Sequence, residues 1–237
     1  MNRTNRCLMP LVLRRCLACL VAPLALAGAA TQAANWPTLA VPPAMEGYVT
    51  VTQSPTEVTL QALVPAPNIT AAGATGVSPY GNDYALRADL VFNLESLTAI
   101  GLAVRVDVAT SSMYGITLNP VDGWLALTKI QGGAPVADFG GYGIAYDAGK
   151  TYTMSLGVTG NTLTGSLYDG ATLLKTLVAT DTDTPFTTGE LGVFAFLPTG
   201  GGDTVSGTWR NPSMVPEPAC LTLLGLAGGL LAMRRRR

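Results

Sequence analysis

The chain has 237 residues, with 14 basic and 15 acidic side chains, four cysteines and no histidine. Because histidine is absent, Ser-His-Asp and Cys-His catalysis and every His-ligated metal site are excluded. Although the formal net charge is −1, the basic and acidic residues are unevenly distributed along the chain. Eight basic residues and all four cysteines lie at the two ends, while the middle holds six basic and fourteen acidic residues, a formal charge of −8. An acidic domain repels phosphate backbones, so nucleic acid is not an expected partner.

Residues 1–34 have the three parts of a secretory signal peptide. Basic residues run to Arg15, an apolar stretch follows from Cys16 to about Ala30, and small residues lead to an expected cleavage after Ala33 or Ala34. The apolar stretch is short for a membrane span, which favours removal by signal peptidase over permanent anchoring. We therefore expect the remainder of the chain to be exported.

The C-terminal end carries a second targeting segment. Its motif has four residues, Val215, Pro216, Glu217 and Pro218. An apolar run follows over residues 219–233, and four arginines end the chain, Arg234, Arg235, Arg236 and Arg237. As a helix this run would be about 22 Å long, so snorkelling arginines and local thinning would be needed to span a hydrocarbon core of roughly 30 Å. Basic residues at both ends stay cytoplasmic, which places the middle outside the inner membrane.

The arrangement over residues 215–237 resembles the PEP-CTERM sorting signal of Gram-negative bacteria. The resemblance implies recognition by a membrane-embedded exosortase, which processes the tail near Pro216-Glu217-Pro218, in an organism that makes extracellular polysaccharide. It implies anchoring in the inner membrane through a helix at 219–237, followed by a cell-surface or extracellular location after processing. The alternatives are an ordinary tail anchor and a chance apolar end of the chain.

The middle, residues 35–209, is strand-like throughout, and residues 210–218 are expected to form a linker. Period-two alternation over 84–92, 102–108 and 152–158 predicts strands with one face on a core and one toward solvent. Gly160-Asn161 and Asp169-Gly170 suit hairpin turns, which predicts a three-strand meander over 152–178. Further strands are expected at 58–63, 113–118, 124–130, 191–197 and 204–209. This many short strands predict an all-β antiparallel β-sandwich or barrel.

Six segments occur in a characteristic order: 84–89, 101–107, 114–118, 123–129, 160–169 and 186–193. In this order, a strand with a basic residue is followed by a strand with a tyrosine and then by a Trp/Leu strand that ends in lysine. A Gly-Asn-x-Leu hairpin comes next, and a Phe-Thr-Thr-Gly-Glu-Leu-Gly strand closes the series. This succession is similar to the concanavalin A-like jelly roll, especially its laminin-G-like and glucanase-related branches. The resemblance implies that fold for residues 80–209.

Carboxylates suited to glycoside hydrolysis are not visible in the sequence. The reaction needs two carboxyl groups about 5 to 10 Å apart, and the glucanase branch carries them in a Glu-x-Asp-x-(x)-Glu strand, which is absent here. The glutamates of the middle stand without a carboxylate two to five residues away: Glu46, Glu57, Glu95 and Glu190. We therefore expect a protein that is not an enzyme.

Two other kinds of site have candidates. Asp181 and Asp183, with Asp203, offer oxygen ligands for calcium, against the alternative of a solvated turn; no other cofactor is expected.

Sugar binding uses exposed aromatic faces and planar polar groups, for which the candidates are Trp124, Tyr142, Tyr146, Arg105, Tyr114 and Asp138. Strand-like surroundings favour core positions for Tyr114 and Trp124. The glycine-rich segment 139–146 favours a loop, which makes Tyr142 and Tyr146 the better candidates. Arg105 and Lys129 equally suit pairing with Asp89 or Asp107.

Together these features predict an exported surface or matrix protein with a lectin-like sandwich that binds the polysaccharide of its own matrix. The alternatives are a glycan-acting enzyme with an unrecognised carboxylate pair and a structural matrix protein without a ligand.

Overall fold

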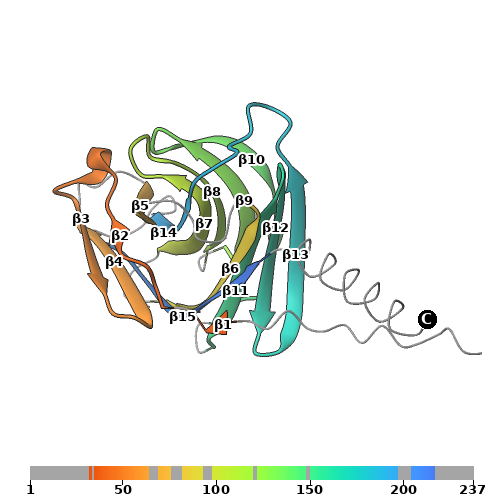
Figure 1. Ribbon diagram of the computed structural model, residues 1–237. Helices are drawn as coiled ribbons and strands as arrows, with labels where there is room; N and C mark the ends of the chain where they lie inside the picture. Colours follow the sequence, from red (N-terminus) through yellow and green to blue (C-terminus); the bar gives the residue numbers. More distant parts are fainter. Residues whose placement is uncertain are drawn as a thin grey trace, which may run out of the picture. The chain divides into compact units, whose positions relative to one another are not determined.

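The computed structural model describes residues 32–33, 35–63, 69–75, 82–92, 98–119, 122–147, 150–196 and 204–216. In this part of the chain the strands form two antiparallel sheets that pack face to face, and Figure 1 shows the first sheet curving around the second. The strand order is β13-β12-β11-β6-β15-β4-β3 in the first sheet and β10-β9-β8-β7-β14-β5-β2 in the second. The predicted all-β antiparallel sandwich is therefore confirmed.

The strands of the first sheet are β3 (Val49–Gln53), β4 (Glu57–Leu63), β6 (Tyr84–Val91), β11 (Tyr152–Thr159), β12 (Thr162–Asp169), β13 (Thr172–Thr180) and β15 (Thr204–Pro216), and β1 (Gln32–Ala33) pairs with β15. The strands of the second sheet are β2 (Leu39–Ala40), β5 (Ile69–Ala74), β7 (Ala99–Asp107), β8 (Ser112–Asn119), β9 (Trp124–Gln131), β10 (Ala134–Gly143) and β14 (Glu190–Phe196). A single 3-10 turn, η1 (Pro43–Met45), precedes β3 in the described residues.

The main core lies between the two sheets and follows the predicted alternation in the first sheet. Every second residue of β6 is buried, from Tyr84 to Leu90, and the residues between them are half-exposed. The expected meander of β11, β12 and β13 is present, with Thr159 opposite Thr162 across the first hairpin. Local alternation and turn chemistry were sufficient here because one face of this sheet meets solvent.

In β7 the prediction of a solvent-facing side is wrong. Residues from Ala99 to Val106 are all buried, because a second apolar cluster covers the face of the second sheet that points away from the main core. Phe194 lies flat on this outer face, and a Cβ at Gly101 or Gly115 would collide with its ring. The Phe194 ring thus fills the space above Gly101 of β7 and Gly115 of β8, which have no side chains.

The strand boundaries differ from expectation in two places. The segment 139–146 was expected to be a loop, but residues 139–143 belong to β10 (Ala134–Gly143), at the edge of the second sheet. Residues 210–216, expected as a linker, continue β15, where Ser213 pairs with Arg87 and Pro216 with Tyr84. The sandwich therefore extends beyond residue 209 to Pro216. Strand β1 falls within the segment expected as signal peptide, with Gln32 opposite Met214.

The targeting predictions for residues 1–31 and 217–237 lie outside the described residues. Within the described residues, no helix has the length and hydropathy needed to cross a membrane.

Candidate functional site

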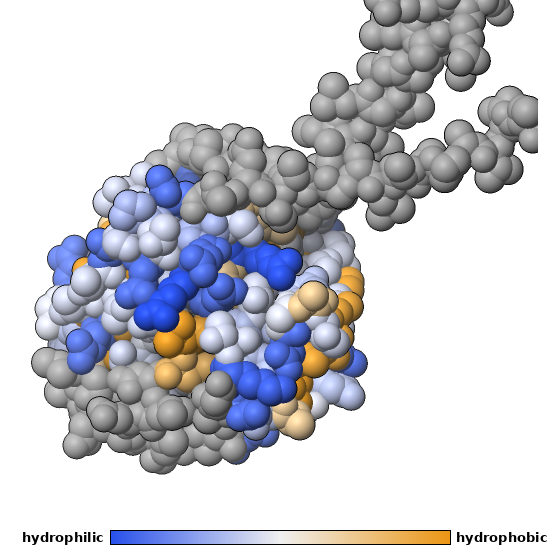
Figure 2. Space-filling view, turned by 90° about the horizontal axis from the view of Figure 1, so that it is seen from below, coloured by the Kyte–Doolittle hydropathy of each residue, from blue (hydrophilic) through white to orange (hydrophobic). Residues whose placement is uncertain are grey.

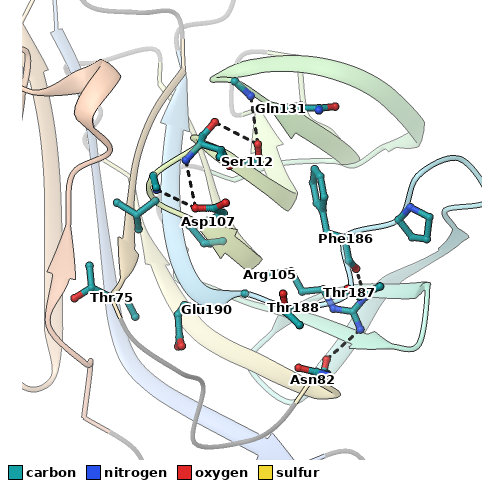
Figure 3. Close-up of a pocket in the computed structure, with 18 residues that line it drawn as sticks. Thr75, Asn82, Arg105, Asp107, Ser112, Gln131, Phe186, Thr187, Thr188 and Glu190 are labelled. Atoms are coloured by element: carbon teal, nitrogen blue, oxygen red, sulfur yellow. Dashed lines mark hydrogen bonds between the residues drawn. The ribbon is translucent and has the colours of Figure 1, made fainter.

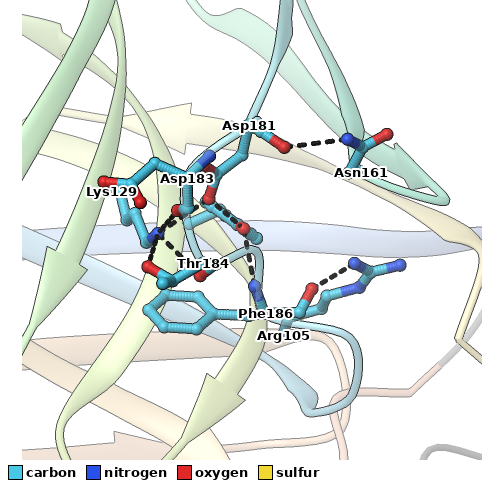
Figure 4. Close-up of polar contacts among 8 residues, drawn as sticks. Arg105, Lys129, Asn161, Asp181, Asp183, Thr184 and Phe186 are labelled. Atoms are coloured by element: carbon cyan, nitrogen blue, oxygen red, sulfur yellow. Dashed lines mark hydrogen bonds and ion pairs between the residues drawn. The ribbon is translucent and has the colours of Figure 1, made fainter.

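The loop 181–189 between β13 and β14 is held by a buried ion pair at its start (Figure 4). The Lys129 ammonium lies 2.8 Å from Oδ2 of Asp181, and the two side chains are 5% and 3% exposed. The Tyr114 hydroxyl donates to the same carboxylate oxygen at 2.6 Å, and the Asp183 amide donates to the other at 2.9 Å. Lys129 therefore pairs with Asp181, and not with Asp89 or Asp107 as considered from the sequence.

The ion pair sets both the charge of Asp181 and the path of the loop. Burial acts to raise the pKa of this carboxyl, but hydrogen bonds from Lys129 and Tyr114 outweigh it, so the pKa lies below its ordinary value. Lys129 also donates to the carbonyls of Asp183 and Thr184, at 2.7 and 2.9 Å. Thr184 has a left-handed backbone, with φ of 47°. These hydrogen bonds hold the loop in a conformation that a threonine alone would not favour.

These contacts bear on the predicted calcium site. Both oxygens of Asp181 already accept hydrogen bonds, and a cation there would have to displace the Lys129 ammonium. Asp203 lies outside the described residues. In the part of the chain that the structure describes, no three acidic or cysteine side chains come together as metal ligands.

Arg105 fixes the other half of the loop. A bulge in β7 gives this residue a φ of 51°, and its side chain is 2% exposed. It donates to the carbonyl oxygens of Phe186 and Asn82 and lies 3.4 Å from Asp83. Its charge is therefore used within the protein, and Arg105 does not present a free guanidinium to a ligand as the sequence prediction supposed.

A cavity of about 1060 Å³ opens beside this loop, at the ends of β7 and β14 (Figure 3). Its polar lining comes from hydroxyl, amide and carboxyl side chains, among them Thr75, Asn82, Asp107, Ser112, Gln131, Thr188 and Glu190. Its apolar lining includes Val106, Pro185 and Phe186. The volume lies at the upper end of the range for small-molecule sites, and the mixed lining suits a polar ligand.

Glu190 is the exceptional group in this cavity. The residue is 7% exposed, and no hydrogen bond or ion pair joins its carboxylate to any other described residue. Burial raises the pKa of this carboxyl above its ordinary value. Its only sequence signal was a carboxylate at the start of an apolar strand, and sequence reasoning did not single it out as a binding residue.

Trp124 forms a second candidate surface, on the outer face of the second sheet. The residue is 45% exposed, so the expectation that it belongs to the core is wrong. It lies opposite Gly143 of β10, and its indole covers Gly141, where a Cβ would overlap the ring. The glycines that made 139–146 look like a loop therefore provide a flat base for the indole. One face of the ring remains open to solvent.

Polar residues lie on the same outer face of the sheet as this indole. Asn119 is the cross-strand neighbour of Trp124 on β8, and its amide donates to the Asp122 carboxylate at 3.0 Å. Further along the same face, Asp138 lies opposite Thr128, and its carboxylate accepts the Gly140 amide at 2.8 Å. We call Trp124 with Asn119, Asp122, Thr128 and Asp138 the indole platform.

The three tyrosine candidates do not share this platform. Tyr114 is fully buried in the Lys129 network, as its strand-like surroundings predicted. Tyr146 packs edge to face on Phe92 and beside Tyr152, with its hydroxyl buried. Tyr142 is 47% exposed, but it lies on the opposite face of β10, with the Lys175 ammonium 3.7 Å from its ring centre.

The outer face of the first sheet has a different character. Figure 2, seen from the side where β15 and β6 lie in Figure 1, shows hydrophilic and hydrophobic residues interspersed. The polar residues here bind one another: Asp89 accepts from Thr153 and Asn211, at 2.7 and 2.9 Å, and Arg87 lies over the Tyr168 ring. These contacts engage the polar groups within the sheet, so this face is not the candidate site.

No protein-family model and no curated protein matches the sequence. Solved structures show the fold. A carbohydrate-binding module, CBM66 from Bacillus subtilis, is similar with a TM-score of 0.57 and 16% identity, covering 76% of this chain and 97% of that one. A β-glucanase from Bacillus licheniformis is similar with a TM-score of 0.51 and 15% identity, covering 77% and 94%. The sandwich is therefore of the jelly-roll type.

Proposed function

We propose that this protein is an exported, non-enzymatic polysaccharide-binding protein with a lectin-like, concanavalin A-like jelly roll. The observation that carries the proposal is the open face of Trp124 on its glycine base. The C–H faces of pyranose rings are apolar and stack on aromatic planes, while their hydroxyls need donors and acceptors at the rim. The indole platform offers both, and a similar fold in a carbohydrate-binding module supports the proposal.

The charges of the domain favour particular glycans. With six basic and fourteen acidic residues in the middle of the chain, anionic polysaccharides would be repelled. The carboxylates of Asp122 and Asp138, which belong to the indole platform, act in the same direction. We therefore expect neutral or cationic polysaccharides to bind, and acidic ones to bind weakly.

The competing proposal is a glycan-acting enzyme, and the cavity gives it a specific form. Glu190 and Asp107 both line this cavity, and Glu190 has the raised pKa that a general acid needs. Against this, one oxygen of Asp107 is committed to the amides of Ala109 and Thr110 in the adjacent turn. Cleavage of a polysaccharide that is lost in both Glu190→Gln and Asp107→Asn would establish the enzyme.

The proposed location of the sandwich, outside the inner membrane, follows from the two targeting segments and from the position at which β15 ends. If exosortase processes the tail near Pro216-Glu217-Pro218, the processing site directly follows β15, which ends at Pro216. The sandwich would then lie immediately against the outer face of the inner membrane until it is released. Protease added to intact spheroplasts should digest the domain, and complete protection would refute export.

A glycan array with the full-length protein tests the binding proposal. We expect Trp124→Ala to lose affinity for the bound polysaccharide by about tenfold or more, as for the removal of a central aromatic contact. Tyr142→Ala is the matched control, because this ring is equally exposed but lies on the other face of β10. Equal losses in the two variants would contradict the placement of the site at Trp124. An array without any signal would contradict the proposal and favour a structural matrix protein without a ligand.

A further inference from the structure

The Glu190 carboxylate faces a cavity without any partner from the described residues, although the residue as a whole is only 7% exposed. A buried carboxylate of this kind carries a desolvation cost that a paired one recovers. In Figure 3 its side chain points into the open space between Thr75, Thr188 and Asn82, away from the guanidinium of Arg105. Among the described residues, none donates a hydrogen bond to this carboxylate, so a ligand in the cavity can do so.

The other described groups of the cavity do not donate to Glu190. Arg105 donates through its terminal guanidinium nitrogens to Phe186, Asn82 and Asp83, and its buried Nε has no partner among the described residues. Asp107 adds a second negative charge, and only one of its oxygens is used by backbone amides. The remaining polar lining is neutral, from threonine, serine, asparagine and glutamine side chains. The cavity therefore combines an unmatched negative charge with hydroxyl and amide groups.

These features discriminate among ligands. An anion would meet two carboxylates, and a divalent cation would need more acidic ligands than the described residues bring together. A neutral sugar would satisfy the hydroxyl and amide lining but would leave the Glu190 charge uncompensated. A sugar with a free ammonium group would satisfy both, because an ammonium donates charge-assisted hydrogen bonds, which are about twice as strong as neutral ones.

We propose that this cavity binds an amino-sugar unit, with Glu190 accepting hydrogen bonds from its ammonium and the threonine and amide groups contacting its hydroxyls. This inference rests on the proposed function, since it selects among the polysaccharides that the indole platform would hold. The two sites involve different elements: Trp124 lies on β9, while Glu190 starts β14. Their contributions can therefore be separated by substitution.

The test is calorimetric titration of the full-length protein with a glucosamine tetramer and with its N-acetylated counterpart, at about pH 6. We expect the wild type to bind the free-amine tetramer about tenfold more tightly. Glu190→Gln should bind the two tetramers equally, and Glu190→Asp should keep part of the preference. A thermal melt of each variant confirms that it is folded.

The Trp124→Ala variant separates a failure of the amino-sugar inference from a failure of the proposed polysaccharide binding. It should leave the ratio of the two tetramer affinities unchanged, because Trp124 does not line the cavity. Equal wild-type affinities for the two tetramers, a ratio that Glu190→Gln does not alter, or no binding of either tetramer would overturn the amino-sugar inference. In each of these cases the proposed function would stand if the array still gives Trp124-dependent binding, and would fail if it does not.

Discussion

Asp181 and Glu190 are both buried carboxylates, and they stand at the two ends of the same loop. Asp181 accepts hydrogen bonds on both oxygens, from Lys129, Tyr114 and the Asp183 amide. Glu190 has no such partner among the described residues and faces the cavity. The pKa of Asp181 is lowered and that of Glu190 is raised, so the same residue chemistry gives opposite electrostatic outcomes. We infer that one carboxylate stabilises the fold, while the other is available to a ligand.

The largest expected effect comes from breaking the paired carboxylate. Asp181→Asn leaves the Lys129 ammonium buried without a counter-charge, and we expect a loss of about 3–5 kcal/mol in the free energy of unfolding. Urea denaturation measures this loss. Asp183→Asn is the control, because the Asp183 side chain is exposed and should change stability little. Equal stability of the Asp181 variant and the wild type would show that the ion pair does not hold the loop.

The same pair predicts a dependence on acid. Because the folded-state pKa of Asp181 is lowered, its stabilisation is present above the unfolded-state pKa and is lost as the pH falls through the folded-state value. Stability of the wild type should therefore fall in strong acid, below the ordinary range of aspartate. The Asp181→Asn variant should show a smaller fall over the same interval in denaturation curves.

The unpaired carboxylate should behave in the opposite way. The raised pKa means that folded Glu190 holds its proton where the unfolded chain has lost it, so stability decreases as the pH rises through that interval. Glu190→Gln should raise the melting temperature by a few degrees at neutral pH and leave it unchanged near pH 4. A lower melting temperature at neutral pH would indicate a stabilising partner for the carboxylate. Among the described residues, the titratable groups around it are Tyr84, Arg105 and Asp107.

The smallest effect is expected from an exposed pair. Arg210 and Glu57 form an ion pair across β15 and β4, with side chains 50% and 40% exposed. Glu57→Gln should change the free energy of unfolding by no more than about 0.5 kcal/mol, since solvent screens such pairs. If Glu57→Gln lowered the free energy of unfolding as much as Asp181→Asn, the buried ion pair would not be more stabilising than the exposed one.

The sequence predicted the parts of the fold that depend on neighbouring residues. The alternation of β6 and the hairpins of β11, β12 and β13 follow from side-chain period and turn residues, and both are confirmed. Features that depend on distant segments were missed. The buried outer side of β7 requires Phe194 and the turn around Met45, which periodicity within β7 does not reveal.

The candidate site was predicted only in part. Trp124 was named as a ligand-binding residue, but its exposure depends on glycines of the neighbouring strand β10, which was expected to be a loop. Arg105 and Lys129 were considered as partners of Asp89 or Asp107, but both bind the loop 181–189, far along the chain. Glu190 was noted only for lacking a nearby carboxylate in sequence, because its isolation is a property of the cavity.

The central claim is that polysaccharide covers the indole of Trp124. The chain has three tryptophans, and Trp36 and Trp209 are 4% and 0% exposed, so acrylamide should quench mainly Trp124. Tryptophan fluorescence of the full-length protein is therefore the most direct measurement, with acrylamide quenching compared before and after saturation with the polysaccharide that the array identifies. The account predicts that bound polysaccharide strongly reduces quenching. Saturation with polysaccharide and unchanged quenching would contradict it.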